Sequence, residues 1–426
     1  MIKKPFFCLS SPSFAYELVN DASVPPRTIN APQNVTLFVK SAYTQKDALA
    51  LCIGQCVKTG QKLTLFNNSD AYVISSVTGE IASIEPYSGN FGQAYTAITI
   101  KTEAVEEHDD AFATSTQPTL ESAQAYLADI PGCPPLASLA DPERPIHTIA
   151  ILGGDNDLLV TTNQYAIMAD TDAVAAGIQF LKEMTGIDNI IIVVPRELVQ
   201  GFGHTGAELA AVDTVYPSLN PKMVMKNVLD SEVPAGQTCE DAGVCFFSAE
   251  AVASIGKAFK DSRIPLTKTI TLITKDEKTI LVKARIGAPF SDIFKACEIE
   301  INANDRMIVG GPLTGTAVYS ENHPVRADTD AIMVQDKADV SLASDYPCIN
   351  CGECVRICPA QIQVHMLVRL LENGMYQEAV EEYDLNSCIN CGLCSLVCAS
   401  KIPIFQYIRL GQYELAELEM MEADND

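Results

Sequence analysis

The chain has 426 residues, with 54 acidic against 29 basic side chains and a formal net charge of −25 at pH 7. This acidic excess argues against a nucleic-acid-binding protein, because phosphates are held by Lys and Arg. The charge either keeps the chain soluble or selects a basic redox partner. No apolar run of about 18 residues could span a membrane, and the segment after Met1 does not resemble a signal peptide. With 15 cysteines, we expect a cytoplasmic protein in a reducing compartment.

Residues 31–102 contain short strand-like segments separated by turn residues. They are Val35–Val39, Leu49–Ile53, Val57–Leu63, Ala71–Val77 and Gly79–Ile84. Many short strands with turns between them predict a small β-sandwich or barrel. The order Val-Lys-x-Gly-Gln followed by Ser-x-Val-Thr-Gly-x-Ile resembles a barrel-sandwich hybrid, which we place at residues 1–110.

Residues 111–145 are predicted to form a linker, in which Thr119 caps a short helix and several prolines follow. From residue 146 to 265 the pattern changes to alternating strands and helices. The strands are expected at Thr148–Leu152, Asn189–Val194 and Ala211–Tyr216, and the helices at Asp172–Thr185 and from Ser248 to Phe259. This alternation predicts a parallel sheet in a Rossmann-like α/β core.

Residues 266–335 are predicted to form a β-grasp unit. A hairpin of Thr269–Ile273 with Thr279–Ala284 precedes a helix at Pro289–Ala296 and a returning strand at Met307–Val309. Residues 340–426 are predicted to form an α-helical module, because apolar residues recur at helical spacing between 360 and 385 and again after Pro403.

Two cysteine motifs in this last module carry the clearest chemistry. Each has the pattern C-x-x-C-x-x-C-x-x-x-C, and 29 residues separate them. Three thiolates on a tight loop and a distant fourth suit a 4Fe–4S cluster, and in two-cluster ferredoxins the fourth Cys of each run binds the other cluster. One predicted ligand set is Cys348, Cys351, Cys354 and Cys398, and the other is Cys388, Cys391, Cys394 and Cys358. Structural zinc and disulfides are the alternatives, although zinc prefers four ligands in two pairs.

The residues around these motifs and the remaining cysteines have weaker signals. We expect an apolar shell for the clusters from Ile349, Val355, Ile357, Ile389 and Val397. Metal binding by Cys52 and Cys56, or a third cluster drawing on Cys239, Cys245, Cys297 and Cys133, is not expected, because ligands are too few or too scattered. The five histidines, including His204 and His365, show no ligand spacing.

The whole assembly resembles the RnfC subunit of the Rnf complex, a membrane-bound ferredoxin:NAD oxidoreductase that pumps ions and serves anaerobic metabolism. The resemblance rests on Val57–Leu63, Glu232–Gly236, Arg285–Pro289, Gly310–Gly315 and Ser400–Ile404, in addition to the cysteine motifs. It implies an iron–sulfur electron-transfer subunit held peripherally on the inner face of the membrane by membrane subunits. A ferredoxin, a flavoprotein or a cytochrome would be the electron partner. The core is also similar to the flavin- and NADH-binding subunit of respiratory complex I.

The family's flavin loop is altered in this chain. A loop of the G-x-G-G-A-G-F-P type lets backbone amides approach phosphate, but Ala128–Leu139 stands in its place with one Gly and three prolines, which offer no N–H. A second part survives as Gly153, Gly154 and Asn156 with Thr161 and Thr162, which would contact FMN if it were retained. The nearby carboxylates Asp155 and Asp157 would repel an anionic phosphate.

Flavin converts the two electrons of a hydride into single electrons. Because the loop keeps only one glycine and its three prolines offer no N–H, we expect two 4Fe–4S clusters without an FMN or NADH site, in a chain that relays single electrons. The alternatives are an FMN-containing NADH:ferredoxin oxidoreductase subunit with a remodelled loop, and a structural scaffold subunit.

Overall fold

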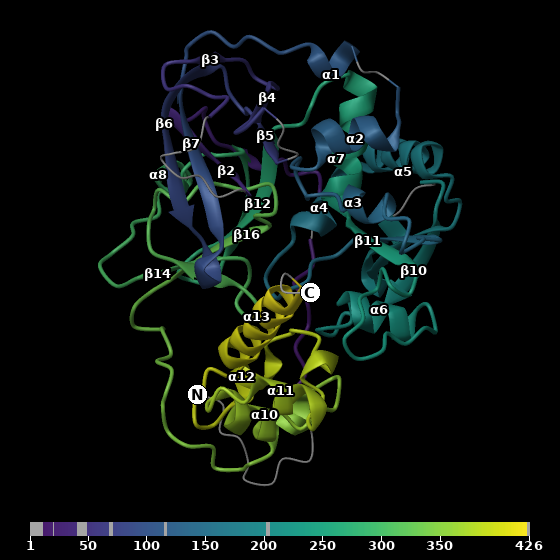
Figure 1. Cartoon of the computed structure of the whole chain (residues 1–426), viewed down its shortest axis with the longest axis vertical. Helices are drawn as coiled ribbons and strands as arrows, with labels where there is room; N and C mark the ends of the chain where they lie inside the picture. The colour runs from purple at the N-terminus through teal and green to yellow at the C-terminus, as the bar shows by residue number, and fades with distance from the viewer. Residues whose placement is uncertain are drawn as a thin grey trace.

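The computed structural model describes residues 12–19, 21–40, 49–67, 71–114, 117–201 and 205–423. The described residues form four sheets. A broad body of sheets and helices occupies the upper part of Figure 1, and the C-terminal helices lie below it. His204 lies outside the described residues.

The N-terminal sheet has the strand order β2-β7-β6-β3 and is antiparallel throughout. Its strands are β2 (Asn34–Val39), β3 (Cys56–Val57), β6 (Gly79–Ser88) and β7 (Ala94–Thr102), and a two-stranded ribbon of β4 (Lys62–Thr64) and β5 (Tyr72–Ile74) completes the unit. In β2, Val35, Leu37 and Val39 are buried and alternate with more exposed residues, as one packed face requires. The prediction of many short strands is confirmed. The predicted strand at Leu49–Ile53 is wrong, because none of these residues lies in a strand, and β7 was missed.

A parallel sheet of order β10-β9-β8-β11 forms the core. Its strands are β8 (Thr148–Leu152), β9 (Ile190–Pro195), β10 (Glu208–Val212) and β11 (Val244–Ser248). Helices α4 (Thr162–Ala169), α5 (Thr171–Thr185), α6 (Pro221–Asn227) and α7 (Ala249–Asp261) belong to the same region, with α1 (Ala111–Thr114), α2 (Leu120–Leu127) and α3 (Leu136–Leu139) before it. Every residue of β8 and β9 is buried, which explains their unbroken apolar sequence.

The prediction of a parallel sheet is confirmed, but its third strand lies earlier than expected. Residues after Val212 leave the sheet and pair instead with the N-terminal segment. Tyr16 donates its N–H to the Thr214 carbonyl, and Tyr216 donates to that of Phe14. A long-range pairing of this kind has no local signal, so the strand-like composition of Ala211–Tyr216 was assigned to the wrong partner.

A six-stranded mixed sheet follows, of order β1-β13-β12-β16-β14-β15. Its strands are β1 (Arg27–Thr28), β12 (Thr267–Ile273), β13 (Thr279–Arg285), β14 (Arg306–Val309), β15 (Thr316–Val318) and β16 (Ala331–Gln335). Helix α8 (Phe290–Ala296) contributes Phe290, Ile293 and Phe294 to the core of this unit. The predicted hairpin is therefore confirmed as β12 with β13.

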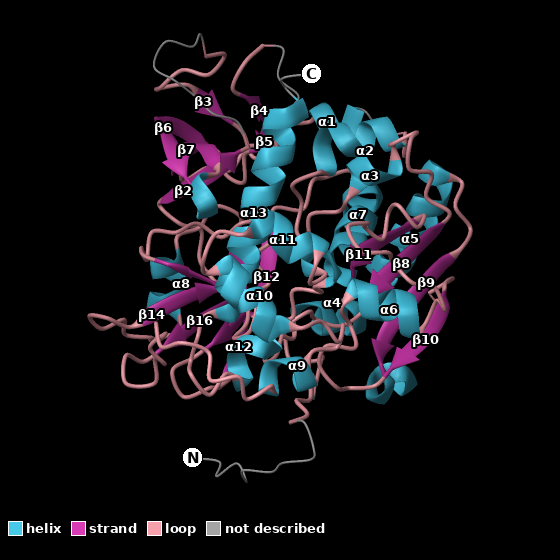
Figure 2. Ribbon diagram, turned by 60° about the horizontal axis from the view of Figure 1, so that its bottom comes forward, coloured by secondary structure: helices cyan, strands magenta, loops and turns pink. Residues whose placement is uncertain are grey.

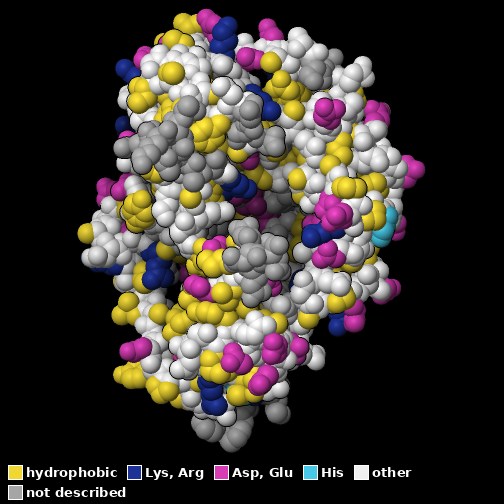
Figure 3. Space-filling model, in the orientation of Figure 1, with side chains coloured by type: hydrophobic (Ala, Val, Ile, Leu, Met, Phe, Trp, Pro, Cys, Tyr) yellow, Lys and Arg dark blue, Asp and Glu magenta, His cyan; other side chains and the backbone are white. Residues whose placement is uncertain are grey.

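The C-terminal module is helical, as predicted. It contains α9 (Glu353–Ile357), α10 (Val364–Leu371), α11 (Tyr376–Glu381), α12 (Leu393–Val397) and α13 (Ile404–Ala423). Figure 2 shows α10, α11 and α13 side by side on the near side of the molecule. None of the described helices is both long and apolar enough to cross a membrane. Acidic side chains are spread over the face drawn in Figure 3 rather than gathered in one patch.

A close helix crossing holds the core together. A Cβ atom at Gly177 of α5 would lie 2.1 Å from the Val252 carbonyl oxygen of α7. One at Gly256 of α7 would lie 2.0 Å from the Ala173 oxygen of α5. Glycine is therefore required on both helices where their backbones touch.

Replacing Gly177 with Leu is expected to destabilise the protein by roughly 1–3 kcal/mol or more, because the helices must move apart. Gln179→Leu, on the exposed side of the same helix, is the matched control and should change stability by less than about 0.5 kcal/mol. Urea unfolding measures both values, and equal effects would contradict the proposed crossing.

Candidate iron–sulfur site

The first group of four cysteines comes from two separate helices and the loop before one of them. Cys354 lies in the first turn of α9, Cys348 and Cys351 precede that helix, and Cys398 follows α12. All four line one small cavity. Burial is the largest cause that raises the pKa of the Cys354 thiol to about 11, and the charges of the neighbouring Cys348, Cys351 and Cys398 contribute to this increase.

The second group repeats this arrangement with the partners exchanged. Burial raises the pKa values of Cys388 and Cys391 to about 11, with a contribution from the nearby charge of Cys358. The pKa of Cys394 is raised well above its ordinary value by burial and then by Cys388, Cys391 and Cys358. The structure thus brings together the same two groups of four that the sequence assigns to two clusters. Their roles as ligands stay a prediction.

The two loops have matching backbone shapes. Asn350 and Gly352 have φ values of 58° and 75°, and Asn390 and Gly392 have 54° and 72°. Left-handed residues at such positions can turn neighbouring amides toward one side, as in an anion-binding nest. The Asn390 N–H donates to the Cys388 sulfur at 3.4 Å. Backbone donors toward sulfur suit a 4Fe–4S cluster, whose sulfur atoms accept hydrogen bonds.

The thiols themselves also suit such a cluster. All described cysteines are free. Within the described chain, no three His, Cys, Asp or Glu side chains could hold a single metal ion. A cubane does not require this, because each thiolate binds a different iron. A cationic iron core would offset the cost of placing four buried thiolates together.

The expected apolar shell is partly present. Val397 is 4% exposed, and Val355, Ile357 and Ile389 pack against buried clusters of apolar side chains. Ile349 also lines the cavity of the first cysteine group, but it is 65% exposed and therefore shields that cavity less than the buried residues do. It precedes the left-handed turn at Asn350, where the chain runs over the outside of the module.

The second cysteine loop rests directly on the α/β core. The Tyr216 hydroxyl donates to the Cys391 carbonyl at 2.6 Å, and the Asn220 amide donates to the Ile389 carbonyl at 3.0 Å. A Cβ atom at Gly392 would lie 2.4 Å from the Leu313 carbonyl oxygen. Asp157 in turn accepts hydrogen bonds from the Leu313 and Thr314 amides. These contacts fix the second cysteine group against the α/β core and the loop that contains Leu313.

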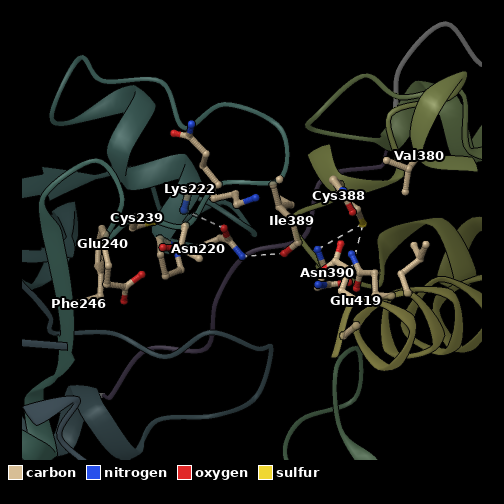
Figure 4. Close-up of a pocket in the computed structure, with 18 of the residues that line it drawn as sticks. Asn220, Lys222, Cys239, Glu240, Phe246, Val380, Cys388, Ile389, Asn390 and Glu419 are labelled. Carbon is tan, nitrogen blue, oxygen red and sulfur yellow. Dashed lines mark hydrogen bonds between the residues drawn. The ribbon is translucent and has the colours of Figure 1, made fainter. Parts of the chain in front are cut away.

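A cavity of about 620 Å³ lies beside these contacts, with Asn220 and Ile389 in its lining. Figure 4 shows Lys222, Cys239 and Glu240 on the core side, with Cys388 and Asn390 on the side of the cysteine module. Lys222 lowers the pKa of Cys388, against the larger upward effect of burial. The cavity therefore places one cation near the second group.

Of the residues predicted to contact FMN, the two glycines and the two threonines are packed against protein. Cβ atoms at Gly153 and Gly154 would lie 2.6 Å from Val194 Cγ1 and 2.5 Å from Leu219 Cδ1. The Thr161 N–H donates to the Thr271 hydroxyl at 3.0 Å, and the Thr162 hydroxyl donates to the Asp330 carbonyl at 2.6 Å. Asn156 is exposed. The chain itself provides the partners of both threonines.

The N-terminus of α4 already holds an anionic group. The Asp155 carboxylate accepts hydrogen bonds from the Asn163 and Gln164 backbone amides at 2.8 and 3.3 Å. Burial raises the pKa of Asp155 to about 7, and the bonds from Asn163 and Gln164 oppose this increase. An internal carboxylate therefore occupies the place where a phosphate would meet the helix amides.

The altered loop packs onto the start of α7. The Gly132 N–H donates to the Ala327 carbonyl at 2.9 Å, and the Ser248 hydroxyl donates to the Gly132 carbonyl at 3.3 Å. A Cβ atom at Gly132 would lie 2.4 Å from the Ala251 nitrogen. Ile130 and Leu136 are fully buried. These contacts pack the altered loop against the rest of the protein.

A buried ionic triad beside this loop was missed in the sequence. The Lys268 side chain is completely buried and pairs with Glu250 and, at 2.6 Å, with Asp330. The Glu250 N–H also donates to the Asn163 side chain, which links the triad to Asp155. Strand alternation was the available signal, because it places Lys268 on the same face of β12 as buried Ile270 and Leu272.

The remaining described cysteines are free and differ in their exposure. Cys52 and Cys56 are exposed. Burial raises the pKa values of Cys239 to about 11 and of Cys245 and Cys133 to about 12, and it also raises that of Cys297. Neutral buried thiols behave as small apolar side chains.

Known protein families match segments near both ends of the chain. Residues 347–402 match the family model of a 4Fe-4S dicluster domain, and residues 19–105 match that of the RnfC barrel sandwich hybrid domain. The C subunit of the proton-translocating ferredoxin:NAD(+) oxidoreductase complex of Clostridium ljungdahlii is 28% identical over 359 residues, covering 78% of this chain and 77% of that protein. The chain is thus similar to RnfC subunits over most of its length.

A second relative is the C subunit of the Na(+)-translocating ferredoxin:NAD(+) oxidoreductase complex of Acetobacterium woodii. It is 24% identical and covers 72% of this chain and 74% of its own length. An NAD+-reducing [NiFe]-hydrogenase in the H2-reduced state matches with a TM-score of 0.46 and 12% identity, over 74% of this chain and 69% of that one. The family models confirm the predicted barrel-sandwich hybrid and the predicted 4Fe–4S domain.

The raised pKa of Asp155 predicts a pH-dependent stability. Its carboxyl releases a proton near pH 4 when unfolded but only near pH 7 when folded. Between these values the folded state binds more protons, so the contribution of Asp155 to stability falls as pH rises. Asp155→Asn should remove this loss, and the variant should gain a few kcal/mol relative to wild type between pH 4 and 8, at about 1.4 kcal/mol per pKa unit.

Denaturant titrations at several pH values measure this difference. Asp172→Asn, at an exposed position on α5, is the control and should show no such trend. A constant difference between wild type and Asp155→Asn across the pH range would contradict the prediction.

Proposed function

We propose that this chain is the iron–sulfur electron-transfer subunit of an Rnf-type membrane-associated complex. The observation that carries the proposal is the exchange of the fourth cysteine between two groups, Cys398 beside Cys354 and Cys358 beside Cys394. This exchange is the ligand pattern of a two-cluster ferredoxin. It is supported by the dicluster family model over residues 347–402.

In this proposal the chain holds two 4Fe–4S clusters. Cys348, Cys351, Cys354 and Cys398 bind the first, and Cys388, Cys391, Cys394 and Cys358 bind the second. Each cluster would accept and release one electron at a time. The protein's part is to bring the two sites together through the crossed ligands and to surround them with apolar side chains. The Tyr216 and Asn220 hydrogen bonds orient the second site against the core.

We also propose that the chain itself does not bind FMN or oxidise NADH. Asp155 supplies the anion at the N-terminus of α4, and Ile130 and Leu136 pack the altered loop into the core. Without a flavin, a hydride cannot be divided into single electrons within this chain. Electrons must then enter and leave through partner proteins, with a ferredoxin, a flavoprotein or a cytochrome as the redox partner.

The finer architecture belongs to the same proposal. We assign the parallel sheet within residues 146–265 to a Rossmann-like core and the mixed sheet within residues 266–335 to a β-grasp domain. The barrel-sandwich hybrid occupies residues 1–110, the linker 111–145, and the cluster module 340–426. The chain would lie on the inner face of the membrane, held there by the membrane subunits of its complex.

Cofactor analysis of the reconstituted chain tests the electron-relay function. We expect about eight irons and eight sulfides per chain, and no flavin released on denaturation. A low-potential dye should reduce both clusters, while NADH should reduce neither. Released FMN with NADH-dependent reduction would instead support the flavin-containing alternative. Iron centres that cannot be reduced by any dye would support a structural scaffold.

Single substitutions test the crossed ligand sets. Cys351→Ala and Cys398→Ala should remove the same electron paramagnetic resonance (EPR) signal, although they lie in different motifs. Cys358→Ala should remove the other signal. Cys297→Ala is the control and should keep both clusters. If Cys398→Ala instead removed the signal lost in Cys391→Ala, the crossed assignment would be wrong.

A further inference from the structure

His365 faces the first cysteine group from the start of α10. It lines the same cavity as Cys348, Cys351, Cys354 and Cys398. Its Nδ1 atom is buried and has no hydrogen-bond partner among the described residues. Only one other buried side-chain N or O atom of the described chain, Thr102 Oγ1, shares this condition. His365 is therefore an exception that needs a physical explanation.

The missing partner has to be something that enters the cavity. The other walls are mainly apolar, with Val368, Ile402 and Ile404 beside the cysteines. Sulfur atoms of a bound cluster are hydrogen-bond acceptors and carry no proton of their own. A neutral imidazole with its proton on Nδ1 donates one hydrogen bond there. His365 Nδ1, a donor without a partner, therefore lines the cavity in which the sulfur atoms of the first cluster are predicted to lie.

We propose that His365 donates an Nδ1–H hydrogen bond to a sulfur of the first cluster and raises the reduction potential of that cluster. This inference rests on the proposed function, because it assumes the cluster. Reduction adds negative charge to the cluster, so a donor aimed at its sulfur stabilises the reduced form more than the oxidised form. His365 is then a positioning and tuning residue rather than a ligand.

The second cluster lacks the equivalent donor. His365 is the seventh residue after Cys358, and the seventh residue after Cys398 is Phe405. Phe405 is 4% exposed and starts α13, as His365 starts α10. The two halves of the module therefore place an imidazole in one position and an apolar ring in the other. This difference makes the two otherwise similar sites chemically unequal.

The test compares His365→Leu, which removes the donor, with His365→Asn, whose amide can place an N–H near the position of Nδ1. Redox titration of the reconstituted full chain, followed by EPR, gives the potential of each cluster. His365→Leu should lower only that of the first cluster. At a fixed potential, its reduced-to-oxidised ratio should fall roughly tenfold, as expected for one charge-assisted hydrogen bond. His365→Asn should recover much of this loss.

Phe405→Leu is the matched control and should leave the potential of the first cluster unchanged. Pulsed EPR of the wild type in D2O adds a direct measurement. An exchangeable proton coupled to the first cluster should be present in the wild type and absent in His365→Leu.

Unchanged potentials in His365→Leu, or an identical exchangeable proton in both proteins, would overturn the proposal. If His365→Leu fails to retain the first cluster, His365→Phe, which introduces the residue found at the equivalent position 405, replaces it and should show the same fall in potential and the same loss of the exchangeable proton. A chain that binds no iron at all would refute the proposed function instead, and the iron content distinguishes that result.

Discussion

The crossed cysteines are the constraint on which the C-terminal module depends. Cys358 ends the first motif but lies with Cys388, Cys391 and Cys394, whereas Cys398 ends the second and lies with the first three. Neither proposed site can be completed by a continuous segment. The helices between the motifs must therefore bring the second motif back beside the first. Val364, Leu367, Val368 and Leu371 form the buried stripe of α10 that allows this return.

The contact between this module and the body is equally specific. It is made by polar groups on loops, with Tyr216 and Asn220 on one side and the backbone of the second motif on the other. Gly392 permits the close approach of Leu313, and Asp157 orders the loop that carries Leu313. Asp157, in the segment that the family resemblance assigns to the flavin region, thus supports the loop on which the second cysteine group rests.

The sequence predicted those features that depend on local pattern. Thiol spacing identified the two motifs, and alternation or helical periodicity located β2, β8 and α10. It failed where the deciding contact is distant in sequence. Thr214 and Tyr216 pair with the N-terminal segment rather than with the sheet. His365 was set aside because it has no partner at ligand spacing, and only the fold shows its Nδ1 buried beside four cysteines.

The apolar cores of the chain differ in what they need to form. The core of the parallel sheet is closed by Ile, Val, Leu and Phe side chains, and the adjacent charges are balanced by the chain itself through Lys268, Glu250 and Asp330. The core of the C-terminal module instead includes Cys354 and Cys394, with most of the other motif cysteines packed around it. Metal binding and folding are coupled when ligands form part of a core. Under the proposed function, folding of the module would therefore depend on the supply of iron and sulfide, whereas the core of the parallel sheet is closed by the chain's own side chains.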